Sequence, residues 1–212
     1  LKKGNVKAAP IKNIPLQLPF NSKAFTPENF GYTVSFDKKG NSFAAELIGD
    51  KVTCDNITFS IADHENKNVI KCKGDTIQLP KEAAGKKLYI LAASTDKDRK
   101  STFLVNGKSH EFEIPYYSGF YGQWGHKGVS DGYIRNASLA YIGSHRHTEK
   151  GNDTYIYTYM YKLGIELPQE AHTLVLPKDE NIAVFAITLS DNYIDDISTA
   201  NEMRTLPLEV SK

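Results

Sequence analysis

Short apolar runs closed by polar turns dominate the chain from Tyr32 onward. GYTVSF ends at DKKGN, SFAAELI ends at GDK, and ITFSIA ends at DHENKN. Later runs such as KLYILAAS, STFLVN, TYIYTYMYKL and IAVFAITL repeat the pattern, and only PKEAAGKK suggests a helical turn. Runs of this length between Gly, Asn and Asp clusters are typical of β-strands. We therefore predict an all-β fold.

Two segments of the chain have similar sequences, and we call this internal similarity the sequence echo. It indicates how the strands are layered. TIQLPKEAAGKKLYILAAS and TLVLPKDENIAVFAIT both place a strand ending in Leu-Pro-Lys before a strongly apolar strand. Proline is suited to the end of a strand, and an apolar strand without alternation suits the space between sheets. The echo predicts two equivalent strand pairs in a two-sheet antiparallel β-sandwich.

The N-terminal segment differs from the rest. Residues 1–27 contain Pro10, Pro15, Pro19 and Pro27, a density that favours extended chain over helix. We expect a lead-in segment or linker there, and one sandwich domain over residues 28–212. Because the sequence begins at Leu1, we expect a processed protein or a piece of a longer one.

The charges are balanced. Lys and Arg number 26 against 25 Asp and Glu, a net charge of +1. No long-range field therefore favours nucleic acid or an anionic membrane as a partner. Cys54 and Cys72 fall on predicted strands, where they form either a cross-strand disulfide or two buried thiols.

Tyrosines alternate with other residues in TYIYTYMYKL. A strand has a period of two, so all four tyrosines, from Tyr155 to Tyr161, are expected on one face. Half-buried core tyrosines with wet hydroxyls are one interpretation, and a stacking platform for sugar rings is the other.

The first candidate for chemistry is GSHRHT. His145 and His147 lie two residues apart on a predicted strand and so share a face, where two imidazoles can bind a metal. A jelly-roll metal enzyme would carry a glutamate four or five residues later, and Gly151 and Asn152 stand there. We therefore expect the pair to lack a third ligand and to be a hydrogen-bonded structural pair or a ligand contact. Arg146 is expected to face a neighbouring strand.

Other catalytic patterns have little support. No serine stands in Gly-x-Ser-x-Gly, and the glycines do not have phosphate-loop spacing. Glycosidic cleavage needs two carboxylates across the bond, and the adjacent Asp195 and Asp196 do not indicate such a pair. We therefore name no catalytic residue. The turn FDKKGN makes Asp37 and Asn41 weak candidates for a calcium site.

A glycine recurs at every third position in GFYGQWGHKG, residues 119–128, with Tyr121 and Trp124 between. Such glycines allow positive φ angles and close backbone approach, which suit a compact lid over the core. The alternative is a loop that displays its aromatic side chains to a ligand.

Several motifs together resemble a known family. LPFNSKAFT, NVIKCKGDTIQLP, KLYILAAS, YSGFYGQWG, SHRHT and ELPQEAHTLVLPKDENIAVFAIT are similar, in order, to the β-sandwich region near the C-terminus of bacterial glycoside hydrolase family 38 α-mannosidase-like proteins. The resemblance covers most of residues 14–190. It implies a fold like the galactose-binding jelly rolls and a catalytic domain, with its zinc and nucleophile, elsewhere in the polypeptide.

Three functions follow as hypotheses. The leading one is a non-catalytic accessory sandwich that supports the catalytic domain of the same polypeptide, in the periplasm or secreted. The alternative is a carbohydrate-binding module that holds glycans with Tyr121, Trp124, His145 and His147. A self-sufficient enzyme is the third. We expect no cofactor on this chain other than the calcium candidate.

The lid interpretation predicts that Trp124→Ala loses about 3 to 5 kcal/mol of stability in denaturant unfolding, because the side chain would leave the core. An exposed stacking residue would change stability by under about 0.5 kcal/mol. An unchanged midpoint combined with lost affinity for a mannoside would instead show that the loop is a sugar-binding surface.

Overall fold

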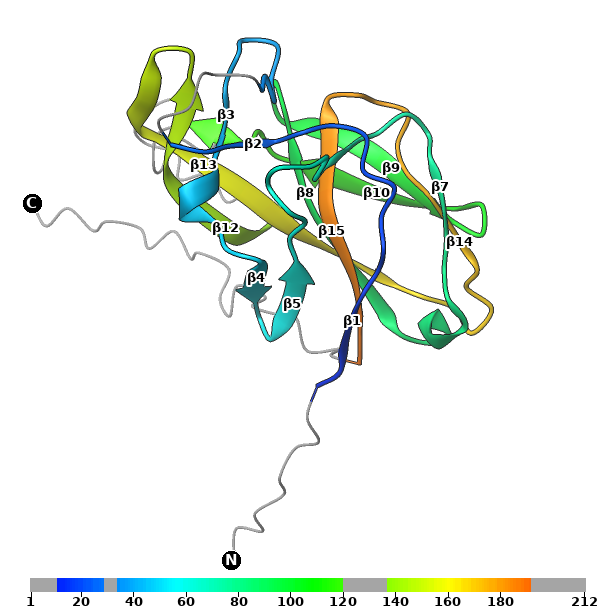
Figure 1. Cartoon of the computed structure of the whole chain (residues 1–212). Helices are drawn as coiled ribbons and strands as arrows, with labels where there is room; N and C mark the ends of the chain where they lie inside the picture. The colour runs from blue at the N-terminus through cyan, green and yellow to red at the C-terminus, as the bar shows by residue number, and fades with distance from the viewer. Residues whose placement is uncertain (1–10, 29–33, 120–136, 192–212) are drawn as a thin grey trace, which may run out of the picture.

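The computed structural model describes residues 11–28, 34–119 and 137–191, whose regular secondary structure is almost entirely β-strand (Figure 1). The strands are β1 (Asn13–Pro15), β2 (Phe25–Thr26), β3 (Ser42–Ala44), β4 (Lys51–Cys54), β5 (Ile57–Ser60), β6 (Ile70–Lys71), β7 (Thr76–Gln78), β8 (Lys87–Ser94), β9 (Arg99–Val105), β10 (Lys108–Ile114), β11 (Ser118–Gly119), β12 (Ser138–Thr148), β13 (Gly151–Glu166), β14 (Thr173–Val175) and β15 (Ile182–Ser190). Two single 3-10 turns, η1 (Ala45–Leu47) and η2 (Lys81–Ala83), interrupt them. The second is the helical turn predicted in PKEAAGKK.

Three sheets make up the described part of the chain. The large sheet has nine strands, with β1-β15-β8-β13-β12-β3-β2 as its main order, β6 also on β15 and β11 also on β13. A four-stranded sheet runs β10-β9-β14-β7, and β4 and β5 form a hairpin. All pairs of strands are antiparallel except β2 with β3. The predicted all-β sandwich of two antiparallel sheets is confirmed.

The central strands of the large sheet, β8 and β15, are buried on both faces. Along β8, Leu88, Ile90 and Ala92 pack in the core shared with the four-stranded sheet, whereas Tyr89 and Leu91 pack in a second core on the opposite face. The second core is covered by the β4–β5 hairpin, by Phe36 in the loop before β3 and by Phe43 of β3. In Figure 1 the hairpin and the four-stranded sheet accordingly lie on opposite sides of β15.

The sequence echo corresponds to two pairs of neighbouring strands. β7 and β14, which precede the two Leu-Pro-Lys motifs, pair with each other in the small sheet. The apolar strands that follow, β8 and β15, pair with each other in the large sheet. The prediction of two equivalent strand pairs is confirmed.

Part of the expected lead-in segment contributes to the large sheet. β1 pairs with the end of β15, and β2 pairs with β3. Leu16, Leu18 and Phe20 pack against the core between the two sheets. The sandwich therefore includes residues well before position 28.

The tyrosine run lies in β13 but does not keep one environment. Tyr159 and Tyr161 are buried in the second core, and Met160 between them is buried too. Tyr155 is 73% exposed and has a φ of 68°, at an irregular stretch of the β12–β13 ladder. The run therefore combines core residues with one displayed ring.

The two cysteines are free thiols. Burial and the hydrogen bond with Asp55 raise the pKa of Cys54 to about 11, and burial raises that of Cys72 further. The structure therefore agrees with two unpaired thiols and not with a disulfide between Cys54 and Cys72. Among the described residues, the helical turns are too short to cross a membrane.

An ion pair between the half-buried Asp55 and the buried Lys162 joins the β4–β5 hairpin to the large sheet. The hairpin turns through Asp55 and Asn56, whose φ angles of 50° and 62° are those of a two-residue turn of the favoured hairpin type. Asp55 Oδ2 accepts a 2.5 Å hydrogen bond from the ammonium of Lys162 in β13, a side chain only 2% exposed. This hydrogen bond lowers the pKa of Asp55.

We predict that Asp55→Asn lowers the free energy of unfolding by roughly 3 kcal/mol at pH 7, because it leaves the buried Lys162 ammonium uncompensated. Asn tolerates the same turn conformation, so the change isolates the charge. The double variant Asp55→Asn, Lys162→Met should recover most of the loss in urea unfolding.

The pH dependence provides a second check. The folded-state pKa of Asp55 is below that of the unfolded chain, so the contribution is present above about pH 4 and is lost as the pH falls. The deficit of Asp55→Asn should therefore shrink below pH 4. A deficit that does not change with pH would contradict the electrostatic explanation.

Candidate metal centre

Two histidines of β12 face the same side of the strand. His145 and His147 have ring centroids 5.5 Å apart. Arg146 between them pairs instead with Asp153 of β13, at 2.7 Å. The shared face of the imidazoles and the turning of Arg146 toward a neighbouring strand are confirmed.

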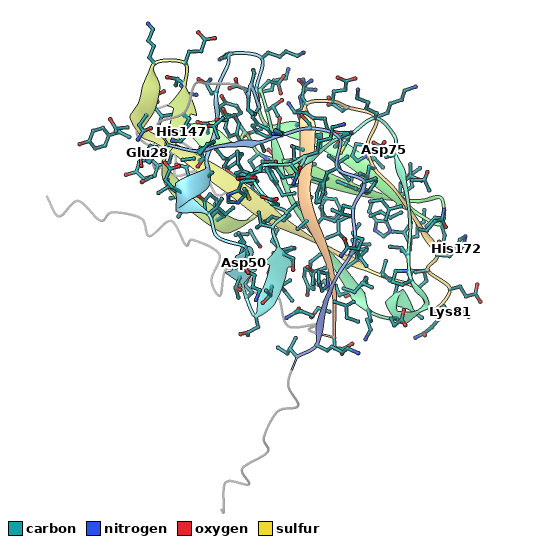
Figure 2. All side chains as sticks on the ribbon, in the orientation of Figure 1. Glu28, Asp50, Asp75, Lys81, His147 and His172 are labelled. Carbon is teal, nitrogen blue, oxygen red and sulfur yellow. The ribbon has the colours of Figure 1, made fainter. Side chains whose placement is uncertain are left out.

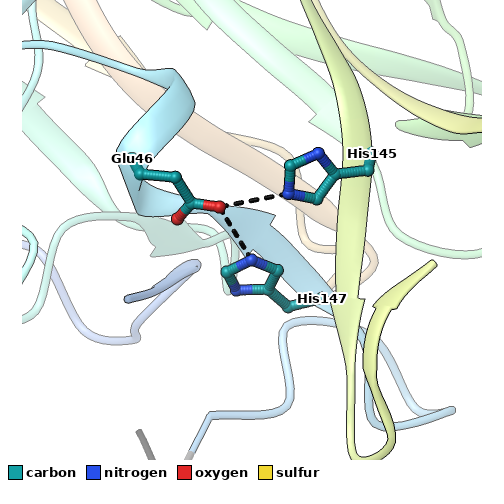
Figure 3. Close-up of side chains that lie close together, drawn as sticks. All are labelled: Glu46, His145 and His147. Atoms are coloured by element: carbon teal, nitrogen blue, oxygen red, sulfur yellow. Dashed lines mark hydrogen bonds and ion pairs between the residues drawn. The ribbon is translucent and has the colours of Figure 1, made fainter. Parts of the chain in front are cut away.

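A carboxylate far away in the sequence completes the group. Oε1 of Glu46 lies 3.1 Å from Nε2 of His145 and 2.9 Å from Nε2 of His147 (Figure 3). One ligand atom from each of the three residues lies within 4.8 Å of the other two. The expectation that the pair lacks a third ligand is therefore wrong. It rested on the residues that follow His147, whereas the third group comes from a residue 99 positions before His145.

Strand pairing brings Glu46 to the histidines. Ser42 of β3 lies opposite His147 in the β3–β12 ladder. The chain then leaves β3 and makes the single turn of η1, in which Ala45 is buried and Glu46 points toward the imidazoles (Figure 3). We call Glu46, His145 and His147 the His–Glu cluster.

Two hydroxyl groups form a hydrogen-bonded chain on the Nδ1 side of His147, away from Glu46. Thr26 of β2 places Oγ1 2.8 Å from Nδ1 of His147 and 2.5 Å from the hydroxyl of Ser42. When Nε2 of His147 donates its hydrogen to Glu46, Thr26 donates to Nδ1; when Nδ1 carries the hydrogen, Thr26 accepts it and donates its own to Ser42, which leaves the Nε2 lone pair available to a metal ion. Thr26 and Glu46 were both missed by the sequence analysis, because only the register of β2, β3 and β12 relates them to the histidines.

The cluster is open to solvent on one side. The side chain of His147 is 5% exposed, that of His145 is 15% exposed, and that of Glu46 is 29% exposed. Figure 2 shows His147 at one end of the molecule, at the opposite side of the view from His172 and Lys81. Imidazole and carboxylate groups in this arrangement can form hydrogen bonds with each other or hold a metal ion.

A buried hydroxyl group borders the cluster. The bare backbone of Gly143 in β12 leaves room for the hydroxyls of Thr158 and Tyr141, which lie 2.5 and 2.7 Å from where a Cβ would be. Burial, and then the negative charge of Glu46, raise the pKa of Tyr141 well above its ordinary range. Tyr141 therefore stays protonated beside the cluster.

The calcium candidates lie elsewhere, in a closed turn. Asp37 and Asn41 are both buried. The Asp37 carboxylate accepts hydrogen bonds from the backbone of Lys39 and Asn41, from the Asn41 amide and from the Tyr117 hydroxyl. A cation would have to displace these donors, so the carboxylate acts here to hold the turn.

The remaining candidates, Tyr121 and Trp124, lie outside the described residues. A cleft of about 850 Å³ that the sequence did not indicate lies next to η1 and is lined by Phe25, Ala45, Ile48 and His64 among others. The rings of Phe25 and His64 are 4.7 Å apart, and burial lowers the pKa of His64.

The sequence also identifies a family. The chain belongs to the family of the AziU2-like beta-sandwich domain, whose model matches residues 12–193. No curated protein matches the sequence. The family is described by its fold, which agrees with the sandwich observed here, and that description names no activity.

We predict that Gly143→Ala destabilises the domain by about 1 to 3 kcal/mol, because the new methyl group would overlap the hydroxyls of Thr158 and Tyr141. Thr158→Ala should partly rescue it, so that the double variant is more stable than the sum of the two single changes predicts. Additive losses in urea unfolding would show that the hydroxyls and Gly143 are not in contact.

Proposed function

We propose that this member of the AziU2-like beta-sandwich family is a non-catalytic accessory domain of a larger α-mannosidase-type protein, where it supports the catalytic domain. The proposal includes a periplasmic or secreted location and a catalytic domain of the same polypeptide as the partner. It rests on the motifs that resemble glycoside hydrolase family 38 and on where those motifs lie in the fold.

The motifs coincide with the strands that build the two cores. NVIKCKGDTIQLP spans β6 and β7, KLYILAAS is β8, and the last and longest motif spans β14 and β15. Because these strands form the centre of the sandwich, the resemblance concerns a whole folded unit. This is the observation that carries the proposal.

The chemistry of the His–Glu cluster is consistent with a supporting role. Glycosidases of the two-carboxylate type hold a pair of carboxyl groups about 5 to 10 Å apart, one on each side of the bond that is cleaved. The His–Glu cluster contributes one carboxylate, and Oε1 of that carboxylate already contacts both imidazoles.

Carbohydrate binding is the second candidate, and one observation favours it. Tyr155 exposes 73% of its surface, and its neighbour Thr154 pairs with His145 across the β12–β13 ladder. A displayed aromatic ring near partly exposed polar groups resembles the surfaces on which sugars stack. Glycans would then be a direct partner of the domain.

We predict that the isolated chain hydrolyses aryl α-mannosides no faster than buffer, both after dialysis against a chelator and after addition of Zn²⁺. Turnover that copurifies with the chain would contradict the non-catalytic role. The full reading frame should encode a glycoside hydrolase domain next to this one, and a frame without such a domain would overturn the accessory role.

Calorimetric titration with methyl α-mannoside separates the two candidates. Binding that is lost in Tyr155→Ala at unchanged stability would replace the supporting role with carbohydrate binding. If the domain has only the supporting role, neither the parent chain nor Tyr155→Ala should give a heat of binding.

A further inference from the structure

The donor atoms of the His–Glu cluster are those that transition metals prefer. Two imidazole nitrogens and one carboxylate oxygen suit Zn²⁺ and neighbouring first-row ions, whereas Ca²⁺ and Mg²⁺ prefer oxygen alone. All three atoms belong to described residues on β12 and η1 and lie within 4.8 Å of one another.

Their separations match the edges of a coordination shell. Zinc binds imidazole nitrogen and carboxylate oxygen at about 2.0 to 2.2 Å. Two such atoms on one ion, at angles between about 90° and 109°, lie about 2.8 to 3.6 Å apart. The two nitrogen–oxygen separations in the cluster are 2.9 and 3.1 Å. All three ligand atoms lie within 4.8 Å of one another, so side-chain rotations can bring them onto one ion.

The hydrogen bonds behind the cluster also fit a metal ligand. Imidazoles that bind metals use their second nitrogen as a hydrogen-bond donor, which fixes the tautomer and the ring orientation. The relay from His147 Nδ1 through Thr26 to Ser42 supplies this partner. Three separate segments of chain are thus arranged around the two Nε2 atoms and one carboxylate.

A purely hydrogen-bonded group is the alternative to a metal site. Both Nε2 atoms converge on the same oxygen, Oε1, although a carboxylate offers two oxygens with about four acceptor positions. One carboxylate oxygen can accept two N–H hydrogen bonds, and the same close approach of three ligand atoms also suits a shared ion.

We propose that Glu46, His145 and His147 bind one divalent transition-metal ion, with Zn²⁺ as its probe. Three protein ligands with a solvent-exposed side leave at least one coordination position for water or a ligand. The ion would link η1 to β12. This site is independent of the accessory role proposed above, because neither requires the other.

The test uses the untagged chain, stripped with a chelator and dialysed. Titration calorimetry and elemental analysis should give one Zn²⁺ per chain, and Zn²⁺ should raise the melting temperature. Co²⁺ should give visible absorption bands in the parent that Zn²⁺ removes. Less than about one fifth of an equivalent bound would overturn the proposal.

Variants separate metal binding from hydrogen bonding. Glu46→Gln keeps an oxygen acceptor for the imidazoles but removes the charge, and His145→Ala removes a ligand that is less buried than His147. Each should weaken Zn²⁺ binding by at least about tenfold and abolish the Co²⁺ bands. Thr26→Val, which removes the relay, should weaken binding by about 10 to 100-fold while all three ligands stay in place.

His172→Ala is the matched control, because His172 is an exposed histidine at the other end of the molecule (Figure 2). It should bind Zn²⁺ like the parent. If Glu46→Gln and His145→Ala fold and bind Zn²⁺ as tightly as the parent does, the ion binds elsewhere and the proposed site is wrong. The mannoside assay is a separate measurement, so its result leaves this one unaffected.

Discussion

The burial of β8 and β15 on both faces is the constraint on which the rest of the structure depends. Every residue of β15 is buried, and so is every residue of β8 after Lys87. A strand with two apolar faces is stable only if something covers each face. The four-stranded sheet covers one, and the β4–β5 hairpin with Phe36 and the β3 residue Phe43 covers the other.

The segment that covers the second core also brings Glu46 to the histidines of the His–Glu cluster. β3 supplies Phe43 to the second core, and its neighbour Ser42 pairs with His147. The chain continues through η1, with Ala45 and Ile48 buried and Glu46 directed outward between them. The packing of apolar side chains thus determines where the Glu46 carboxylate lies, and the His–Glu cluster lies at the polar edge of the second core.

Local patterns predicted the features that depend on local physics. The period of two placed His145 and His147 on one face, and the Leu-Pro-Lys echo indicated which strands are equivalent. Glu46 could not be found in this way, because its contact with His145 spans 99 positions and follows from how β3 pairs with β12. Tyr157, Tyr159 and Tyr161 contact the same core, as the alternation predicts, but Tyr155 does not, since the irregular pairing there interrupts the alternation.

The strands at the two borders of the large sheet limit how this domain can associate with others. β1 has three residues and ends in Pro15, and β2 has two residues and is followed by Pro27. A long border strand with free backbone groups would recruit strands from other chains and seed aggregates, whereas short borders with proline offer few places for such pairing. At these two borders a neighbouring domain or molecule would therefore meet this one through side chains and loops, without extending the large sheet. The four-stranded sheet differs, because its border strand β10 has seven residues.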